Sequence, residues 1–307
     1  METLTFLYNL DMNMKKVLVI AGPTAAGKTS FGIKCAQQFN GEIISGDSVQ
    51  IYKGLNIGSA KVSEEEKKQC PHHLIDIKNP NENYNVKEFQ ELSRHYIDEI
   101  TSKNKLPIIV GGTGLYIKAS LYDYNFFDEK EKDDPYDELS NQEIYDILKE
   151  KDPNALKTIH INNRKRLVRA LNIYNKHKIG ISEIKEKQEH KLLYDACIVG
   201  LSKDRNELYD LISKRVYQMI DNGLIKEIKS LLDSGITFDN QSMQAIGYKE
   251  FKPYFLNQAS LDSCIEEVIK NTKHFAKRQY TWFNNQLNVN WFFNENEALK
   301  KVKEWYE

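Results

Sequence analysis

Eight consecutive residues have the types and the spacing of a phosphate-binding loop. They match the pattern GxxxxGK[ST] in full and are Gly22, Pro23, Thr24, Ala25, Ala26, Gly27, Lys28 and Thr29. The glycines allow the backbone to wrap a phosphate with its N–H groups exposed. Lys28 can bridge phosphate oxygens, and the Thr29 hydroxyl can ligate Mg²⁺. Kinases, NTPases and other pyrophosphate users share this loop, so it does not identify the phosphate compound.

An aspartate follows the second apolar, strand-like segment of the chain. Asp47 stands in the stretch ISGDSVQIY, at the carboxyl end of the expected strand, where ligands bind in open α/β sheets. One interpretation is a general base or an Mg²⁺-linked carboxylate near the phosphates. The other is an aspartate that forms a turn or caps a helix, with Ser48 following it. Spacing alone leaves both open.

Two further residues are candidates for phosphate contacts. Thr113 lies in Gly-Gly-Thr-Gly after the third strand-like segment and can donate to a phosphate oxygen, although a tight strand-to-helix turn explains the pattern equally well. Arg215 lies between Ile212 and Met219, inside an apolar stripe at helical spacing. A buried arginine needs an anionic partner. That partner is either a structural carboxylate or a substrate phosphate.

A basic run without any acid occupies residues 162–178. Its charges can meet a nucleic-acid backbone or form a solvated helix face, and they are Arg164, Lys165, Arg166, Arg169, Lys176 and Lys178. Residues 270–278 repeat this pattern beside aromatic residues, which suit nucleic acid or the core. The adjacent His72 and His73 do not share a face, so a hydrogen-bonded pair is expected rather than a metal site.

The elements that must position these residues alternate between strand and helix. Short apolar segments at 15–21, 42–45, 106–110 and 196–201 predict strands, with helices between them, including one that begins at residue 85. This alternation predicts an α/β fold with a parallel sheet covered on both faces. We expect an N-terminal extension over 1–14, a core over 15–119 and 195–307 with C-terminal helices, and an inserted helical domain over 120–194.

Composition is that of an ordinary globular protein. The 307 residues carry 43 basic and 44 acidic side chains, and 40% are hydrophobic. No run of about 18 apolar residues is present, so no membrane association is expected. The four cysteines are far apart, which favours reduced thiols and a cytoplasmic protein.

Seven motifs in this order resemble those of the tRNA dimethylallyltransferases (tRNA isopentenyltransferases). Several are weak individually, but their order and spacing from about residue 16 to residue 291 are very specific. They are GPTAAGKTS, ISGDSVQIYKGLNIGSAK, PHHLID, VGGTGLYIKA, RKRLVRAL, QAIGYKE and AKRQYTWF.

The resemblance implies a P-loop NTPase-like sheet with flanking helices and an inserted helical domain that closes on the tRNA anticodon stem-loop. The implied reaction transfers a dimethylallyl group from dimethylallyl pyrophosphate to N6 of the adenosine at position 37, 3′ of the anticodon, in tRNAs reading codons that start with U. The phosphate-binding loop would hold the pyrophosphate with Mg²⁺ at Thr29. Asp47 would be the general base, and Thr113 and Arg215 would stabilise the pyrophosphate.

The resemblance also implies a set of tRNA contacts, in a protein that we expect to be monomeric. The matching residues are Asp47, Ser48, Val49, Gln50, Thr113, Lys165, Arg166, Leu167, Val168, Arg169, Gln244, Gly247 and Lys249. The chain departs from the family in two places. It ends soon after Trp291 without a CxxC…HxxxH extension, as in the shorter bacterial form, and Asn284 stands where the family often has arginine.

Two other functions share some of these features. An ATP-dependent small-molecule kinase of the P-loop class would explain the nucleotide-binding loop and Asp47, but not the basic helical insertion. A non-catalytic RNA-binding module regulated by a nucleotide would explain the basic run. It would not explain why Asp47, Thr113 and Arg215 follow the pattern of one active site.

Overall fold

The computed structural model describes residues 14–124, 126, 135–187 and 191–307. The predicted N-terminal extension, 1–14, lies outside the described residues except for Met14. The described chain forms two compact units, one up to Tyr122 and from Leu193 to Glu307, the other Asp123–Leu192.

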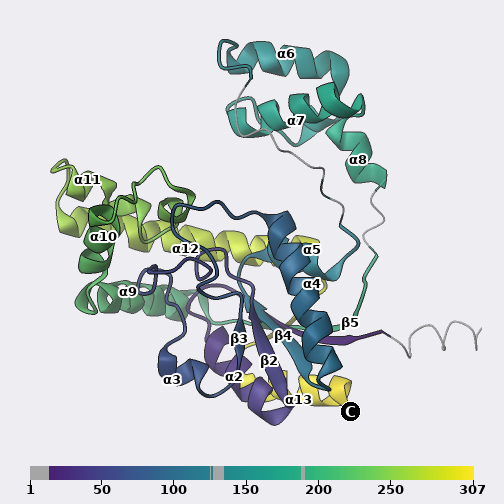
Figure 1. Ribbon diagram of the computed structural model, residues 1–307, viewed down its shortest axis with the longest axis vertical. Helices are drawn as coiled ribbons and strands as arrows, with labels where there is room; N and C mark the ends of the chain where they lie inside the picture. The colour runs from purple at the N-terminus through teal and green to yellow at the C-terminus, as the bar shows by residue number, and fades with distance from the viewer. Residues whose placement is uncertain (1–13, 125, 127–134, 188–190) are drawn as a thin grey trace, which may run out of the picture. The chain divides into compact units, whose positions relative to one another are not determined.

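The first unit is built on a parallel six-stranded sheet (Figure 1) in the order β3-β2-β4-β1-β5-β6. Its strands are β1 (Lys16–Ala21), β2 (Gly41–Ser45), β3 (His72–His73), β4 (Leu106–Gly111), β5 (Asp195–Leu201) and β6 (Asn290–Phe292). Leu18 on β1 is in register with Ile108 on one side and Cys197 on the other. The predicted α/β class with a parallel sheet is therefore confirmed. Every residue of β1 and β2 except Lys16 is buried, as expected for central parallel strands.

Helices cover both faces of this sheet. Ile108 and Val110 point toward α2 (Lys28–Gln38), whereas Ile109 points to the opposite face, toward α5 (Gly114–Leu121). The α2 face also receives α13 (Glu295–Tyr306), through Ala298 and Val302. The other face carries α4 (Val86–Ser102), which is capped at Asn85 as the sequence predicts.

The remaining helices of this unit follow β2 or β5. They are α3 (Glu64–Lys67), α9 (Arg205–Asp221), α10 (Leu224–Asp233), α11 (Lys252–Phe255) and α12 (Leu261–Gln286), with short 3₁₀ turns at Gln241–Gln244 and Lys249–Phe251. Figure 1 shows α9 to α12 gathered together. Asp204 caps α9, and Leu208, Ile212 and Val216 are its buried residues. Met219, which the sequence places in the apolar stripe, is half-buried and lines a cavity.

Two edge strands escape the sequence-based prediction. β3 has two residues and β6 has three, too few to show a periodic pattern. In β3 the imidazole of His73 bonds the Glu42 carboxylate through Nε2 at 2.7 Å, and Nδ1 of His72 donates to the Cys70 carbonyl. All four cysteines are free and buried.

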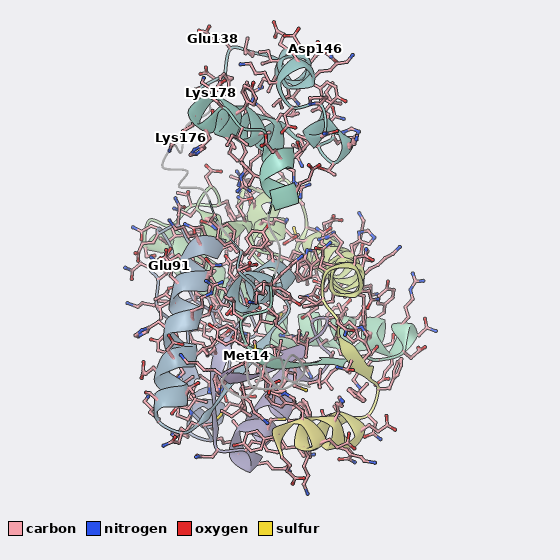
Figure 2. All side chains as sticks on the ribbon, turned by 90° about the vertical axis from the view of Figure 1, so that its right-hand side faces the viewer. Met14, Glu91, Glu138, Asp146, Lys176 and Lys178 are labelled. Atoms are coloured by element: carbon pink, nitrogen blue, oxygen red, sulfur yellow. The ribbon has the colours of Figure 1, made fainter. Side chains whose placement is uncertain are left out.

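The second unit is helical. It contains α6 (Asn141–Lys151), a 3₁₀ turn (Ala155–Lys157), α7 (Arg164–His177) and α8 (Ile181–Lys187). Helices α6 and α7 pack through a small apolar core that includes Ile144, Leu148 and Leu171. Figure 2 labels the exposed Lys176 and Lys178 near the end of α7. Among the described residues, no helix is both long and apolar enough to cross a membrane.

Candidate active site

A cavity of about 490 Å³ lies where three neighbouring strands of the first unit end. Strands β2, β4 and β1 are adjacent in the sheet, so the segments that follow them meet at one edge. These segments carry Asp47, Thr113 and the loop Gly22–Thr29, and all three contribute to the lining. Helix α9 adds Arg215, which completes the set of predicted catalytic residues around one space.

The loop Gly22–Thr29 has the backbone that its sequence predicts. Gly22 has φ 144°, and a Cβ there would lie 2.6 Å from the carbonyl oxygen of Leu201 on β5. Only glycine therefore fits between β1 and β5. Gly27 adopts a left-handed conformation (φ 90°) immediately before α2. The loop thus leads into a helix N-terminus, the arrangement that favours anion binding.

The side chain of Lys28 folds back onto this loop. Its ammonium donates to the carbonyl of Pro23 at 2.6 Å, inside its own loop. Burial and the positive charge of Arg215 lower the pKa of Lys28 from 10.5 to about 7, although the negative charge of Asp47 acts in the opposite direction. In the free protein Lys28 is therefore charged below about pH 7 and largely neutral above it, and a bound anion would stabilise its charged form.

The surroundings of Arg215 test the first of its two predicted partners, a structural carboxylate. Within the described part of the chain, no carboxylate lies within 4 Å of its guanidinium, and Nη1 donates to the Thr24 hydroxyl at 3.4 Å. The structural carboxylate, one of the two partners predicted for Arg215, is therefore not found among the described residues. Burial lowers the pKa of Arg215, and the charge of Asp47 opposes that shift. The guanidinium thus faces the phosphate-binding loop as a cation that no described carboxylate pairs with.

Asp47 forms the predicted turn and still has a free carboxylate oxygen. Its Oδ1 accepts hydrogen bonds from the N–H groups of Val49 at 2.8 Å and Gln50 at 3.2 Å. Among the described residues, Oδ2 has no hydrogen-bond partner. The two interpretations of Asp47 are therefore compatible, because one oxygen fixes the turn and the other is available to a ligand.

Thr113 lies at the N-cap position of α5 without capping it through its side chain. Its carbonyl accepts from the N–H groups of Tyr116 and Ile117, so the backbone closes the first helical turn. The hydroxyl remains for a ligand in the cavity that Thr113 lines.

Gln279 is a cavity residue that sequence reasoning missed. Its Oε1 accepts from the Thr24 N–H at 3.0 Å, and its Nε2 donates to the Gly112 carbonyl at 3.0 Å. A Cβ on Gly112 would lie 2.1 Å from that amide nitrogen. Gln279 thus ties the phosphate-binding loop to the segment that carries Thr113. The available signal was a polar residue four positions before the buried Phe283 in an apolar stripe.

The other predicted tRNA-contacting residues occupy different places. In the first unit, Ser48, Val49, Gln50 and Gly247 line the cavity, while Gln244 and Lys249 are exposed outside its lining. In the second unit, the exposed residues among the predicted contacts at 165–169 are Lys165, Arg166 and Arg169. Leu167 is completely buried in the core of that unit, and Val168 packs against this core. These two side chains therefore pack α7 against the core of that unit.

The residues at the loop suit a hard divalent cation. Thr29 lies in the first turn of α2 and lines the cavity. Asp47 lines the same cavity. Such cations take oxygen ligands and often need only one or two from the protein when phosphates supply others. Within the described residues, no group of three or more His, Cys, Asp or Glu side chains is placed to hold a metal. A cation here would depend on the substrate's phosphates.

The fold and the cavity define a P-loop α/β protein in which the cavity is lined by a carboxylate and by an arginine that pairs with no described carboxylate. A family model described as IPP transferase matches residues 50–286. The chain therefore belongs to the IPP transferase family, whose members are tRNA dimethylallyltransferases, and it is a transferase rather than a small-molecule kinase.

Individual relatives support this assignment over nearly the whole chain. A tRNA dimethylallyltransferase of Anoxybacillus flavithermus is 48% identical over 91% of this chain and 90% of its own. The tRNA isopentenylpyrophosphate transferase of Staphylococcus epidermidis has a TM-score of 0.71 at 40% identity and covers 94% of this chain and 99% of its own. A eukaryotic dimethylallyltransferase acting on tRNA has a TM-score of 0.82 at 29% identity, over 94% of this chain and 77% of its own.

Proposed function

We propose that this protein transfers a dimethylallyl group from dimethylallyl pyrophosphate to N6 of the adenosine at position 37, 3′ of the anticodon, in tRNAs reading codons that start with U. The observation that carries the proposal is the unpaired Arg215 beside Lys28 and the loop Gly22–Thr29, in the same cavity as Asp47. Two cations and a loop of N–H groups suit a leaving pyrophosphate. The carboxylate suits an attacking amine.

In this mechanism Asp47 acts on the amine. The exocyclic amine of adenine is a weak nucleophile because its lone pair is delocalised into the ring. As N6 bonds to the prenyl carbon, the carbon–oxygen bond to the pyrophosphate breaks and Oδ2 of Asp47 accepts the amine proton. The turn bonds on Oδ1 hold the carboxylate in place during this step. The target base must leave its stack to reach the cavity.

The leaving group is held by the phosphate-binding loop and its neighbours. Lys28, Arg215 and the Thr113 hydroxyl contact the pyrophosphate as its negative charge grows. Mg²⁺ at Thr29 would neutralise part of that charge when bound. The loop thus serves a reaction in which phosphates depart and no phosphoryl group is transferred.

The second unit would provide the main contact with the anticodon stem-loop. Its exposed Lys165, Arg166 and Arg169 can meet backbone phosphates, which position an RNA without reading its sequence. We assign residues 120–194 to this tRNA-binding domain and the remainder from residue 15 to the catalytic core. The enzyme would act as a monomer in the cytoplasm.

The direct test combines the purified protein, labelled dimethylallyl pyrophosphate, Mg²⁺ and unmodified tRNA, followed by nucleoside analysis. The proposal predicts label in N6-isopentenyladenosine 3′ of the anticodon and release of pyrophosphate. Phosphorylation of a small molecule by ATP, without prenylation of tRNA, would favour the kinase. Binding of tRNA without turnover would favour the RNA-binding module.

Affinity for inorganic pyrophosphate is expected to fall as the pH rises above about 7. Lys28 has its pKa lowered to about 7 in the free protein, so it is charged below that pH and largely neutral above it. An anion binds the charged form, so above pH 7 binding must include proton uptake, and affinity falls up to about tenfold per pH unit. Calorimetry in buffers of different ionisation enthalpy measures that uptake. Lys28→Met controls for the protons of pyrophosphate itself, and equal uptake by both proteins would contradict the prediction.

Replacing Lys165 and Arg166 with alanine is expected to weaken tRNA binding and reduce its salt dependence. Each lost phosphate contact removes about one unit from the slope of log K against log salt, so the double variant should lose about one to two. Binding at several salt concentrations gives the slope. Lys149→Ala with Lys157→Ala removes the same charge from exposed positions of the same unit. An equal loss of affinity and slope in this control would mean that residues 165 and 166 only form a solvated helix face.

A further inference from the structure

Glu227, which lies outside the cavity lining, accepts four hydrogen bonds through its carboxylate. Glu227 on α10 accepts the N–H groups of Asn56 at 2.9 Å and Ile57 at 2.8 Å on Oε2. Its Oε1 accepts the Tyr248 hydroxyl at 2.7 Å and the N–H of Gly58 at 3.3 Å. No lysine or arginine lies within 4 Å of it among the described residues, so its charge is stabilised by these donors.

Of the four donors, Gly58 lines the cavity, and the other three are next to two segments that line it. Residues 58–60 and residues 245–247 both line the cavity. They pack closely, because a Cβ on Gly58 would lie 2.6 Å from the Tyr248 ring. A Cβ on Gly247 would lie 3.3 Å from the carbonyl oxygen of Gly58. Glu227 bonds to both segments at once and thereby holds the wall together.

This wall in turn supports the turn that carries Asp47. The Gln50 side chain donates to the carbonyl of Ala60 at 3.2 Å, and its backbone N–H donates to Oδ1 of Asp47. Ser45, at the end of β2, has its hydroxyl 3.4 Å from Oε1 of Gln50. A hydrogen-bonded path therefore runs from Glu227 through the segment 56–60 and Gln50 to Asp47.

We propose that Glu227 is a positioning residue for prenyl transfer, which holds the cavity wall and, through Gln50, the turn of Asp47. The inference rests on the proposed function, since it assigns a role within that reaction. Glu227 lies outside the cavity lining and contacts no reacting atom. Its effect would therefore be on the geometry of the Asp47 carboxylate and of the flipped adenine, and not on the pyrophosphate, which we assign to the loop Gly22–Thr29 and Arg215.

Glu227→Gln tests this role with little change in size. Its amide keeps one acceptor oxygen but presents an N–H₂ donor toward backbone N–H groups, so part of the set of four bonds is lost. Asp233→Asn is the matched control, because it makes the same charge change on the same helix at an exposed residue that pairs with Lys229. Tyr248→Phe removes only one donor and provides a milder second variant.

Three measurements separate the possible outcomes. In Glu227→Gln we expect faster hydrogen exchange at the amides of residues 56–58 and a kcat lower by about ten- to a hundredfold, with pyrophosphate affinity nearly unchanged. Tyr248→Phe should change kcat in the same direction but less, and Asp233→Asn should change neither exchange nor kcat.

Two results would overturn the proposal. One is unchanged exchange in Glu227→Gln, and the other is faster exchange with an unaltered kcat and KM for tRNA, which would make Glu227 purely structural. Failure of the proposed function is distinguishable, since the unsubstituted protein would then fail to prenylate tRNA. The exchange experiment would still report on the hydrogen bonds of Glu227.

Discussion

Asp47→Asn is expected to slow prenyl transfer by about 10²- to 10⁴-fold, the usual contribution of a positioned general base. Asparagine keeps an oxygen that can accept the N–H groups of Val49 and Gln50, so the turn should survive. It cannot accept the amine proton. Binding of pyrophosphate and of tRNA should therefore change little, and the loss should appear in the rate of the chemical step.

Single-turnover rates with saturating tRNA and labelled dimethylallyl pyrophosphate measure this step directly. Asp47→Ala is the companion variant, since it removes both the base and the turn. We expect it to show the same chemical defect together with weaker tRNA binding. A rate for Asp47→Asn close to that of the unsubstituted protein would rule out Asp47 as the base.

Arg215→Met is expected to have opposite effects on activity and on stability. Removing a cation from the pyrophosphate should lower kcat/KM by about 10²- to 10³-fold. The guanidinium has no carboxylate within 4 Å among the described residues, and burial lowers its pKa, so it costs free energy in the ligand-free protein. The Tm of the free protein should therefore stay the same or rise.

The same variant should also shift the pH dependence of pyrophosphate binding. Arg215 is one of the causes that lower the pKa of Lys28, so its removal should raise that pKa above about 7. The fall in affinity would then begin at a higher pH. Arg215→Lys retains the charge without the planar pair of donors and should be intermediate in activity. A Tm several degrees lower for Arg215→Met would mean that the arginine has a structural partner after all.

The sequence by itself determined the elements whose information is local. The phosphate-binding loop is contiguous, so its eight residues specify both its backbone and its chemistry. Four strands of the sheet were predicted because each is a short apolar segment, and their observed limits differ from the expected ones by only one residue. The cap at Asn85 likewise depends on neighbouring residues.

Only the tertiary structure decided which of these elements meet. The placement of β4 between β1 and β2 is what brings Thr113 and Asp47 to the phosphate-binding loop, and strand order depends on contacts between distant segments. The same reason applies to Arg215. The sequence could not say whether a structural carboxylate pairs with it, and only the residues packed around it decide that question. Gln279 and Glu227 bond to residues that lie as far as 255 and 171 positions away in the chain, respectively. Such contacts leave no local pattern, because each donor or acceptor is ordinary in its own segment.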